Sequence, residues 1–360
     1  MKILHFITSL RTGGAERLMT GLLPGLAAAG HDVELLVMDG TPTPFMEALK
    51  SSGVEVHSLS IGAAAMHNPL LAMPLRRFLR NGRYDIVHTH NTPCQILAAA
   101  VAPRGFTLVT TEHNTTNRRR GNRILRAADA RMYRRYKAIV ACSPAVGQAL
   151  AAYLPETAAR ISVIENGIDL EVFKNAAPAS DIIRRFPDKK ILVMAAAFRP
   201  QKDHATMLEA LRLLPTRFAL VLAGDGATRP GVEHLCHEKG LDERVFFAGN
   251  RADMPAVMAS AFINVLATHH EGLPLSAIEA MASGRPFIGS DVAGLREAIL
   301  PGALAVPHAS PDTLARAVLS LESNPLKYAE VASACTERSN HFDISHTIEG
   351  YNTLYKNLCR

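Results

Sequence analysis

Short apolar runs rich in β-branched residues alternate with longer helix-like stretches along most of this chain. In the first half the runs are ILHFIT, VELLV, VEVHSL, YDIVHT, FTLVTT, KAIVAC and ISVIEN. Such runs are typical of strands that are buried on both faces, as in a parallel sheet covered by helices. The alternation therefore predicts parallel βαβ units.

The alternation pauses after about Asn166 and then restarts. The pause, GIDLEVFKNAAPASD, is followed by ILVMAAAF, FALVLAG, RVFFAG, AFINVLA and PFIGS. A chain of 360 residues is also too long for one ordinary domain. We therefore interpret the pause as a linker, and we expect an α/β protein with two Rossmann-like, doubly wound parallel sheets that face a cleft.

Beyond Pro311 the strand pattern ends, and three segments are predicted to be helices: DTLARAVLSLES, NPLKYAEVASACTERS and SHTIEGYNTLYKNL. We expect a first domain over residues 1–168 and a second over residues 169–340. The helix within residues 341–360 is expected to pack back on the first domain.

Composition favours a folded globular protein, because 48% of the residues are apolar and 20% are charged. The apolar run at the N-terminus stops at Thr8 and Ser9 with no small-residue cleavage site after it, so we interpret it as a first strand and expect a cytoplasmic location. The five cysteines are scattered without a Cys-x-x-Cys pair, which predicts neither a disulfide framework nor a zinc site. Most of them are expected to be buried.

The net charge of +6 is concentrated in one segment. Residues 118–137 carry nine Arg or Lys and one Asp, a net charge of +8, so the other 340 residues together carry −2. On a helical projection one broad face holds the cations Arg119, Arg123, Arg126, Arg134 and Lys137. A second face holds Leu125, Ala128, Met132 and Tyr136.

A basic amphipathic helix of this kind predicts docking to an anionic lipid surface, and a solvated charged helix is the alternative. Nucleic acid is not expected as a partner, because the segment offers no stacking aromatics beyond Tyr133 and Tyr136 and no recognisable binding module.

In open α/β sheets, ligands bind beyond the carboxyl ends of the strands. The first loop there, TSLRTGGAERL, has Gly13 and Gly14 just before a helix that starts near Ala15, where the backbone could approach a ligand closely. The loop lacks G-x-G-x-x-G and the Walker lysine, which disfavours a dinucleotide oxidoreductase or a P-loop ATPase. An ordinary tight turn is the alternative.

Two further loops follow strands of the second half. AAAFRPQKDH carries Arg199 and Lys202, which could neutralise a diphosphate or remain solvated. LAGDGATR places Gly224 and Gly226 on either side of Asp225, which is consistent with a wall of a nucleotide site or with a simple turn.

The stretch HHEGLPLSAIEAMASGRP sets Glu271 and Glu279 eight residues apart. Ser276 and Glu279 could form a capping box, but Pro274 suits a first helical turn, so we expect the helix to begin before Ser276 with Glu279 on its second turn. Glu271 would precede a helix N-terminus that attracts anions. The spacing predicts phosphate on the N–H groups and hydroxyl-bearing groups at either side.

The pattern E-x7-E in EGLPLSAIE, followed by AMASGRP, resembles the retaining glycosyltransferases of family 4, whose two Rossmann-like domains face each other in the GT-B fold. The resemblance extends over nearly the whole chain, through GGAE, TEH, ENGID, FRPQKD, AGDG, VFFAGNRADMP, the glutamate motif and GSDVAG. One departure is Phe198, where the family usually has a glycine before the arginine of the phosphate loop.

The resemblance implies transfer of a sugar from a nucleoside diphosphate, most often UDP, with retention of configuration. It implies that Glu279 binds the ribose hydroxyls and that Glu271 contacts the donor sugar. The diphosphate would be held by the backbone from Gly272 through Leu273 to Leu275, with Arg199 and Lys202 opposite. Gly14 would approach from the first domain, and Gly224 would lie on the nucleotide side.

His113, in TEH after the strand FTLVTT, matches the family histidine near the reacting end of the sugar. Glu112 and Asn114 are candidates for orienting it or for contacting the acceptor, on the same side as Gly13, Arg119, Arg123 and Arg126. Arg251 is expected near the nucleobase, with a loop ion pair as the alternative.

No Asp-x-Asp motif stands at a suitable strand end, so we expect neither a metal nor another cofactor. The basic segment follows His113 directly, which favours a glycan or lipid-linked acceptor and a peripheral position on the inner face of the cytoplasmic membrane. Two alternatives remain open: a sugar-nucleotide epimerase or hydrolase on the same fold, and a catalytically silent nucleotide-sugar-binding protein.

Overall fold

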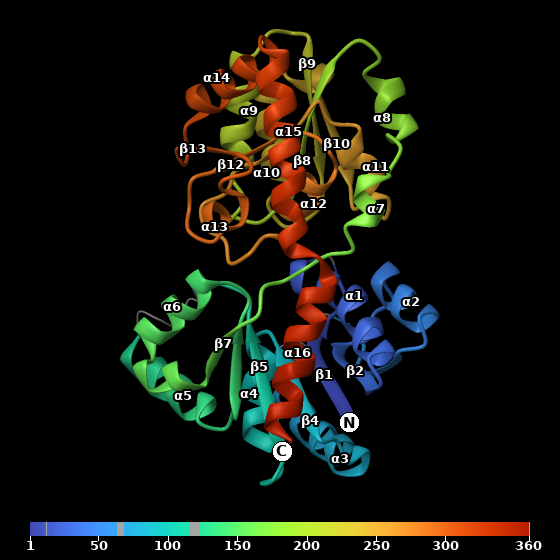
Figure 1. Cartoon of the computed structure of the whole chain (residues 1–360), viewed down its shortest axis with the longest axis vertical. Helices are drawn as coiled ribbons and strands as arrows, with labels where there is room; N and C mark the ends of the chain where they lie inside the picture. Colours follow the sequence, from blue (N-terminus) through green and yellow to red (C-terminus); the bar gives the residue numbers. More distant parts are fainter. Residues whose placement is uncertain (12, 63–67, 116–121, 360) are drawn as a thin grey trace. The chain divides into compact units, whose positions relative to one another are not determined.

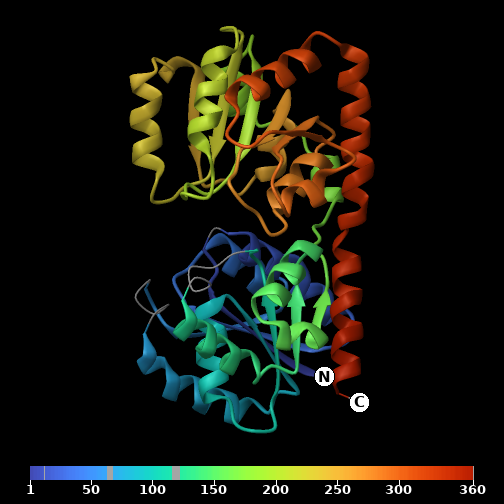
Figure 2. The ribbon, with the colours of Figure 1, turned by 90° about the vertical axis from the view of Figure 1, so that its left-hand side faces the viewer.

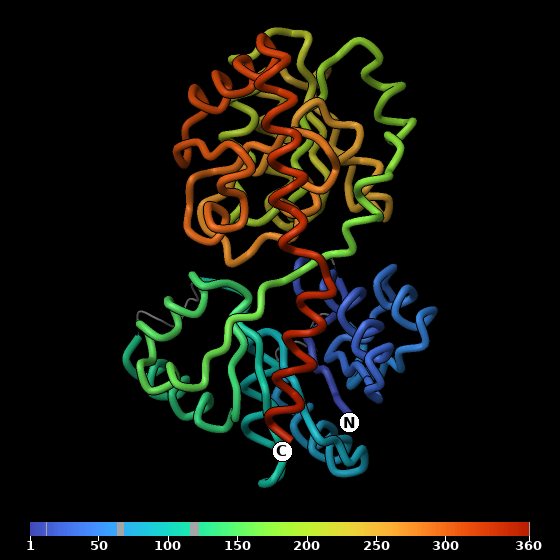
Figure 3. Tube along the Cα trace, in the orientation of Figure 1, coloured from blue at the N-terminus to red at the C-terminus, as the bar shows by residue number. Residues whose placement is uncertain are grey.

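The computed structural model describes residues 1–11, 13–62, 68–115 and 122–359 (Figure 1). It divides into two compact units, which we call unit 1 (Met1–Gly167 with Ile344–Arg360) and unit 2 (Ile168–Asp343). The chain leaves unit 1 once and returns to it once, as the trace in Figure 3 shows.

Unit 1 contains a seven-stranded parallel sheet in the order β3-β2-β1-β4-β5-β6-β7. Its strands are β1 (Lys2–Ser9), β2 (Asp32–Asp39), β3 (Glu55–Ser60), β4 (Ile86–His90), β5 (Thr107–Glu112), β6 (Ala138–Ala141) and β7 (Ile161–Val163). Each of the seven runs singled out in the first half forms a strand, and every neighbouring pair is parallel. The predicted parallel βαβ architecture is confirmed.

Helices cover both faces of this sheet. They are α1 (Gly14–Ala28), α2 (Pro44–Ser51), α3 (Ala72–Gly82), α4 (Thr92–Val101), α5 (Arg123–Tyr133), α6 (Pro144–Tyr153) and α16 (Ile344–Leu358), with 3-10 turns at Pro69–Leu71 and Pro155–Arg160. The last helix, α16, lies beside α1 (Figure 1), so closely that a Cβ at Gly25 would stand 2.1 Å from Ile348 Cδ1. Glycine at position 25 therefore permits this packing.

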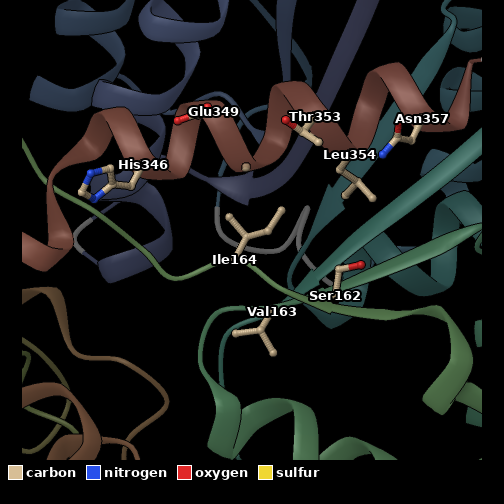
Figure 4. Close-up of a pocket in the computed structure, with 9 residues that line it drawn as sticks. Ser162, Val163, Ile164, His346, Glu349, Thr353, Leu354 and Asn357 are labelled. Carbon is tan, nitrogen blue, oxygen red and sulfur yellow. The ribbon is translucent and has the colours of Figure 1, made fainter.

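A pocket of about 470 Å³ lies between α16 and the end of the edge strand β7 (Figure 4). Its strand side is formed by Ser162, Val163 and Ile164, and its helix side includes Glu349 and Thr353. It contains none of the site residues predicted from the sequence.

Unit 2 contains a six-stranded parallel sheet in the order β10-β9-β8-β11-β12-β13. Its strands are β8 (Lys190–Ala195), β9 (Phe218–Ala223), β10 (Val245–Gly249), β11 (Ile263–Leu266), β12 (Phe287–Ser290) and β13 (Leu304–Val306). The sequence predicted the first five. Strand β13 was not predicted; its three residues form a short run between Pro301 and Pro307.

The helices of unit 2 are α7 (Glu171–Lys174), α8 (Ser180–Arg185), α9 (His204–Leu213), α10 (Arg229–Glu238), α11 (Met254–Ala259), α12 (Leu275–Ala282), α13 (Leu295–Ile299), α14 (Pro311–Glu322) and α15 (Pro325–Ser339). One group, α9, α10 and α14, packs on one face of the sheet, and α11, α12 and α15 pack on the other (Figure 2). The predicted C-terminal helices form as α14, α15 and α16.

The predicted linker needs correction. Most of GIDLEVFKNAAPASD belongs to unit 2, where it forms α7 and leads into α8. Phe173 and Ile182 are buried, and α7 contacts α11 and α12. These buried apolar side chains fix the segment on unit 2, so the first crossing between the units lies at residues 167–168.

Four of the five cysteines are buried, as expected, and Cys359 is exposed. Among the described residues, none of the helices combines the length and the apolar character needed to cross a bilayer.

Candidate active site

A buried ion pair lies beyond the carboxyl ends of two central strands of unit 2. Lys202 Nζ donates to Glu271 Oε1, and only 13% and 6% of these side chains are exposed. Thr268 Oγ1 donates to the same oxygen over 2.7 Å, and Gln201 Nε2 donates to Oε2 over 3.2 Å. Both carboxylate oxygens therefore have donors, as a buried charge requires.

The strand order explains why these residues meet. Strand β8 lies between β9 and β11, so the chain reverses direction across the sheet there, which is where open α/β sheets place their ligands. The loops after β8 and β11 also pair with each other through a bridge between Lys202 and Thr268, and the N–H of Asp203 donates to the carbonyl of Ala267 over 3.0 Å. The two loops form one rigid platform.

Arg199 lies on the same loop as Lys202 but is exposed. Its guanidinium has no partner within the part of the chain that the structure describes. Its neighbour Phe198 is fully buried, and the ring stacks on His204 with centroids 4.2 Å apart. The family's usual glycine is thus replaced by an inward-facing ring, and Arg199 keeps its exposed position.

Gly224 and Gly226 support the loop from the other side. A Cβ at Gly224 would lie 2.1 Å from the carbonyl oxygen of Ala196, and one at Gly226 would lie 2.3 Å from that of Phe198. Both glycines have positive φ, which favours glycine. They shape the backbone of the platform.

Helix α12 begins at Leu275 with Pro274 before it and has no side-chain cap. The helix therefore starts before Ser276, as predicted, and no capping box forms. Among the described residues, the N–H groups of Leu275 and Ser276 have no acceptor, so the positive end of the helix dipole is available to an anion. Glu279 is 6% exposed and lies on the second turn.

The turn between Glu271 and α12 is compact. Leu273 is 5% exposed, and a Cβ at Gly294 would lie 2.4 Å from the carbonyl oxygen of Glu271 and 2.5 Å from that of Gly272. Gly294 has a φ of +80°. Gly294, the last residue of the GSDVAG motif, therefore packs directly against the backbone of this turn.

Arg251 forms the ion pair that the sequence left open as an alternative. Its guanidinium donates two hydrogen bonds to Asp181, of 2.6 and 3.1 Å, and two to Asp253, both 2.7 Å. Hydrogen bonding to Arg251 lowers the pKa of both carboxyl groups. In this arrangement Arg251 fastens α8 to the loop after β10.

In unit 1, His113 follows the last residue of β5. Its Nε2 lies 3.2 Å from His90 Nδ1, and the enclosing protein lowers its pKa to about 4. The carboxylate of Glu112 accepts from Gln95 Nε2 over 2.5 Å and from Tyr133 Oη over 2.6 Å, whereas Asn114 is exposed.

The partner that the structure gives His113 is thus His90, which the sequence analysis did not consider. The signal was present in YDIVHTH, because His88 and His90 alternate along one strand and must share a face.

Gly13 and Gly14 stand at the start of α1, which begins at Gly14. A Cβ at Gly14 would meet nothing within 4 Å, while one at Gly13 would meet the Glu16 carboxylate. Gly14 therefore leaves open space at the helix N-terminus of unit 1.

The basic helix is shorter than predicted and is turned differently. Arg119 lies outside the described residues, and α5 starts after its cap Asn122, whose side chain accepts from two backbone N–H groups. Arg123 is exposed at its first turn, and Arg126 donates to the carbonyl of Tyr153 over 3.1 Å.

The buried side of α5 consists of Asp129, Ala130, Met132 and Tyr133. The predicted apolar face is wrong for Leu125 and Ala128, which are exposed, since α5 rests on the unit through its second half.

A groove of about 880 Å³ runs beside α4 and α5. Ile96 and Leu125, both partly exposed, contribute apolar surface. Arg76, Arg104 and Arg131 are exposed at the groove, and their guanidinium groups have no partner in the described ranges. We call this feature the basic groove.

One group of side chains in unit 2, with a buried Asp203 and two exposed histidines, could hold a metal ion. Asp203, His269 and His308 bring one ligand atom each to within 4.8 Å of one another. His269 Nδ1 and His308 Nε2 are 2.5 Å apart.

Two family models match the chain. The model described as Glycosyltransferase Family 4 matches residues 12–172, and Glycosyl transferases group 1 matches residues 178–340. EpsF of Bacillus subtilis (strain 168) is 28% identical over 307 residues, which cover 81% of this chain and 79% of EpsF.

Two further proteins carry more specific names. The UDP-Gal:alpha-D-GlcNAc-diphosphoundecaprenol alpha-1,3-galactosyltransferase of Escherichia coli is 26% identical over 237 residues, covering 61% of each chain. The crystal structure of Anabaena HepE with UDP-glucose superposes with a TM-score of 0.87 at 20% identity, covering 99% of this chain and all of HepE. The HepE structure shares the fold of this chain.

Proposed function

This chain belongs to glycosyltransferase family 4, and we propose that it transfers a sugar from UDP to an acceptor hydroxyl with retention of configuration. The observation that carries the proposal is the platform of unit 2. There a buried Lys202–Glu271 pair, the exposed cation Arg199 and the uncapped start of α12 lie on connected loops. Such a platform suits a ligand that combines a diphosphate with hydroxyl groups.

Each donor group has a matching residue. The N–H groups of Gly272, Leu273 and Leu275 and the cations Arg199 and Lys202 would bind the diphosphate, because helix N-termini and cations both attract phosphate. Glu271 would accept from hydroxyls of the donor sugar, and Glu279 from those of the ribose. Gly224 shapes the nucleotide side.

In unit 1 we assign His113 to the reacting end of the sugar, and Glu112, Asn114 and Gly13 to the acceptor side. Gly14 would approach the diphosphate. Arg251 is retained as a support of the nucleobase side through its ion pairs, not as a direct ligand.

The reaction breaks the bond between the anomeric carbon and the diphosphate and forms a bond from that carbon to the acceptor oxygen. Negative charge grows on the departing diphosphate, where Arg199, Lys202 and the start of α12 stabilise it. For retention, the acceptor attacks from the side on which the diphosphate leaves. Its hydroxyl proton passes to an oxygen of the departing diphosphate.

UDP is proposed as the donor nucleotide, and the HepE complex with UDP-glucose and the UDP-Gal in the name of the Escherichia coli relative support this choice. Because the cations Arg199 and Lys202 would neutralise the diphosphate, we propose that no metal is needed. If one were needed, Asp203, His269 and His308 would be its place.

We propose that the acceptor is a lipid-linked glycan or glycolipid and that unit 1 docks on the inner face of the cytoplasmic membrane. The basic groove supports this, since its arginines and its exposed Ile96 and Leu125 match an anionic headgroup above a hydrocarbon layer. Each cation close to such a surface contributes about 1 kcal/mol.

Sedimentation with phosphatidylglycerol vesicles tests the docking. Arg131→Glu should weaken partition by about 2 kcal/mol, roughly 30-fold, while Arg184→Glu, an exposed arginine of unit 2, should have little effect. Equal losses in both variants would contradict docking through the groove.

Thermal unfolding with UDP, GDP, ADP and dTDP, each with and without its common sugars, tests the donor. A ligand at ~100 times its Kd adds about 2.7 kcal/mol to stability, so only uridine nucleotides should raise the Tm strongly. Stabilisation by another base would overturn the UDP assignment.

Product analysis separates the two alternatives. Conversion of the UDP-sugar without an acceptor would indicate an epimerase or hydrolase. Tight binding with no turnover across lipid-linked acceptors would indicate a silent binding protein.

A further inference from the structure

Four histidines of unit 1 form one hydrogen-bonded chain that ends at His113. From His113 Nε2 it runs to His90 Nδ1 over 3.2 Å, and from His90 Nε2 to His5 Nδ1 over 3.0 Å. His5 Nε2 lies 3.3 Å from Tyr355 Oη, which lies 2.5 Å from His88 Nδ1. His88 Nε2 then contacts Thr111 Oγ1 over 2.7 Å.

The sheet register creates this chain. His5 on β1 lies directly opposite His88 on β4, and His90 follows on the same face two residues later. The neighbours of His5, Leu4 and Phe6, point into the apolar core on the other side of the sheet. Tyr355, on α16, is fully buried against the histidine face.

The three histidine rings in the interior of this hydrogen-bonded chain are neutral. His5, His88 and His90 are completely buried, and burial lowers the pKa of His5 to about 3 and those of His88 and His90 well below the usual value. A neutral imidazole has one N–H and one lone pair. Each link therefore needs one proton, and a reversed ring would set two N–H groups or two lone pairs against each other.

A mismatch of that kind leaves buried polar groups unpaired, at about 1–3 kcal/mol each. All hydrogen bonds of the histidine chain therefore run in one direction, which we call its polarity. Either every proton points away from His113 or every proton points toward it.

Tyr355 decides between the two polarities. Its hydroxyl has one proton, so it donates to one histidine and accepts from the other. The contact with His88 Nδ1 is 2.5 Å and the one with His5 Nε2 is 3.3 Å, and O–H donors make the shorter hydrogen bonds. Tyr355 thus donates to His88 and accepts from the N–H of His5.

The consequence follows link by link. His5 Nδ1 must accept from His90 Nε2–H, and His90 Nδ1 must accept from His113 Nε2–H. His113 Nδ1 is then left without a proton, and within the described part of the chain it has no partner.

We propose that His5, His90 and Tyr355 are positioning residues that hold His113 in its Nε2–H tautomer, so that Nδ1 presents a lone pair to a hydroxyl of the bound sugar or acceptor. This inference rests on the proposed function for the identity of that hydroxyl. A neutral ring that offers a lone pair accepts from hydroxyl groups and does not attract phosphate oxygens.

A metal site does not explain the same cluster. His5, His88 and His90 bring ring nitrogens within 4.8 Å of one another, but these nitrogens already take part in the hydrogen-bonded chain. All six nitrogens of these three rings also have hydrogen-bond partners.

Nitrogen NMR of the full chain labelled with ¹⁵N-histidine tests the proposal directly, because protonated and unprotonated ring nitrogens have well-separated shifts. We expect His113 to show a protonated Nε2 and an unprotonated Nδ1. A wild-type His113 protonated at Nδ1 would overturn the proposal, whatever the activity of the enzyme.

Tyr355→Phe removes the hydroxyl that sets the polarity, and Tyr351→Phe is its matched control. Tyr351 is equally buried on α16, but its hydroxyl contacts only Thr111 among the histidine-chain atoms, over 2.9 Å. We expect Tyr355→Phe to mix the two tautomers of His113 and Tyr351→Phe to leave them unchanged. An unchanged His113 spectrum in folded Tyr355→Phe protein would refute the role of Tyr355.

Kinetics then connect the tautomer to transfer. In Tyr355→Phe, kcat should fall by roughly twofold to tenfold, in proportion to the lost competent tautomer. The Kd for UDP should not change, because UDP is assigned to unit 2. An unaltered kcat alongside mixed tautomers would remove His113 Nδ1 from the reaction. Absence of transfer in the wild type would refute the proposed function and leave the tautomer result standing.

Discussion

Replacing Lys202 with methionine removes the cation from a carboxylate that has almost no access to water. Breaking a buried ion pair costs about 3–5 kcal/mol when the other charge remains. Here Thr268 and Gln201 still donate to Glu271, and hydrogen bonds to a charged group each contribute about 1.5–3 kcal/mol. We therefore expect the lower end, a loss of about 3 kcal/mol.

The double variant Lys202→Met with Glu271→Gln separates stability from catalysis. It removes both charges and leaves a neutral amide for Thr268 and Gln201, so most of the lost stability should return. Transfer should not return, because the cation at the diphosphate is still missing. Removal of one group that stabilises developing charge typically costs about 10²–10³ in kcat.

Hydrogen exchange resolved by peptide is the suitable assay, since a chain of two units need not unfold in one step. The effect should appear in peptides of β8 and β11. Lys189→Met is the control, because Lys189 is exposed and its ammonium donates, among the described residues, only to the carbonyl of Thr216. It should change stability by no more than about 0.5 kcal/mol. Full transfer by the double variant, or a loss below ~1 kcal/mol in the single one, would refute this reasoning.

Three further outcomes are expected. Arg199→Gln should weaken UDP-sugar binding by about 1.5–3 kcal/mol in calorimetry with no change in Tm, and an equal Kd would remove Arg199 from the donor site. EDTA should leave transfer unchanged; a loss that added metal restores would point to the cluster of Asp203, His269 and His308. Because burial lowers the pKa of His5 to about 3 and that of His113 to about 4, the unfolded chain binds more protons than the folded one below about pH 6.5. Stability of unit 1 should therefore fall from about pH 6.5 toward pH 4, by up to ~1.4 kcal/mol per pH unit for each ring. Thermal melts of His5→Asn should show a shallower dependence than those of the wild type, and an equally steep one would contradict the reasoning.

The fold could be predicted because its signal is local. Buried parallel strands are continuous apolar runs, and twelve such runs along the chain became strands β1 to β12. The predictions failed where tertiary packing overrode the local sequence pattern. Phe173 looked like part of a linker, yet its burial fixes α7 on unit 2.

The helix α5 shows the limit of a helical projection. Leu125 and Met132 fall on the same projected face, but only Met132 is buried, because the helix meets unit 1 through its second half alone. Periodicity shows which residues share a face and not where along the helix the support lies.

In the candidate site, too, the motifs predicted individual residues, whereas the contacts between them depend on the fold. From the sequence, Lys202 and Glu271 were predicted to contact the same ligand as separate groups. Their contact with each other could not be predicted, because it depends on β8 and β11 being neighbours. The position of His90 next to His113 could not be predicted either. His113, which we assign to the reacting end of the sugar, lies in a motif, whereas the residues proposed to fix its proton come from β1, β4 and α16, up to 350 positions apart along the chain. On this proposal, the tautomer of His113 depends on the register of the sheet and on the packing of the last helix. Substitutions at positions 5 and 355 are expected to alter transfer without touching any motif of the family.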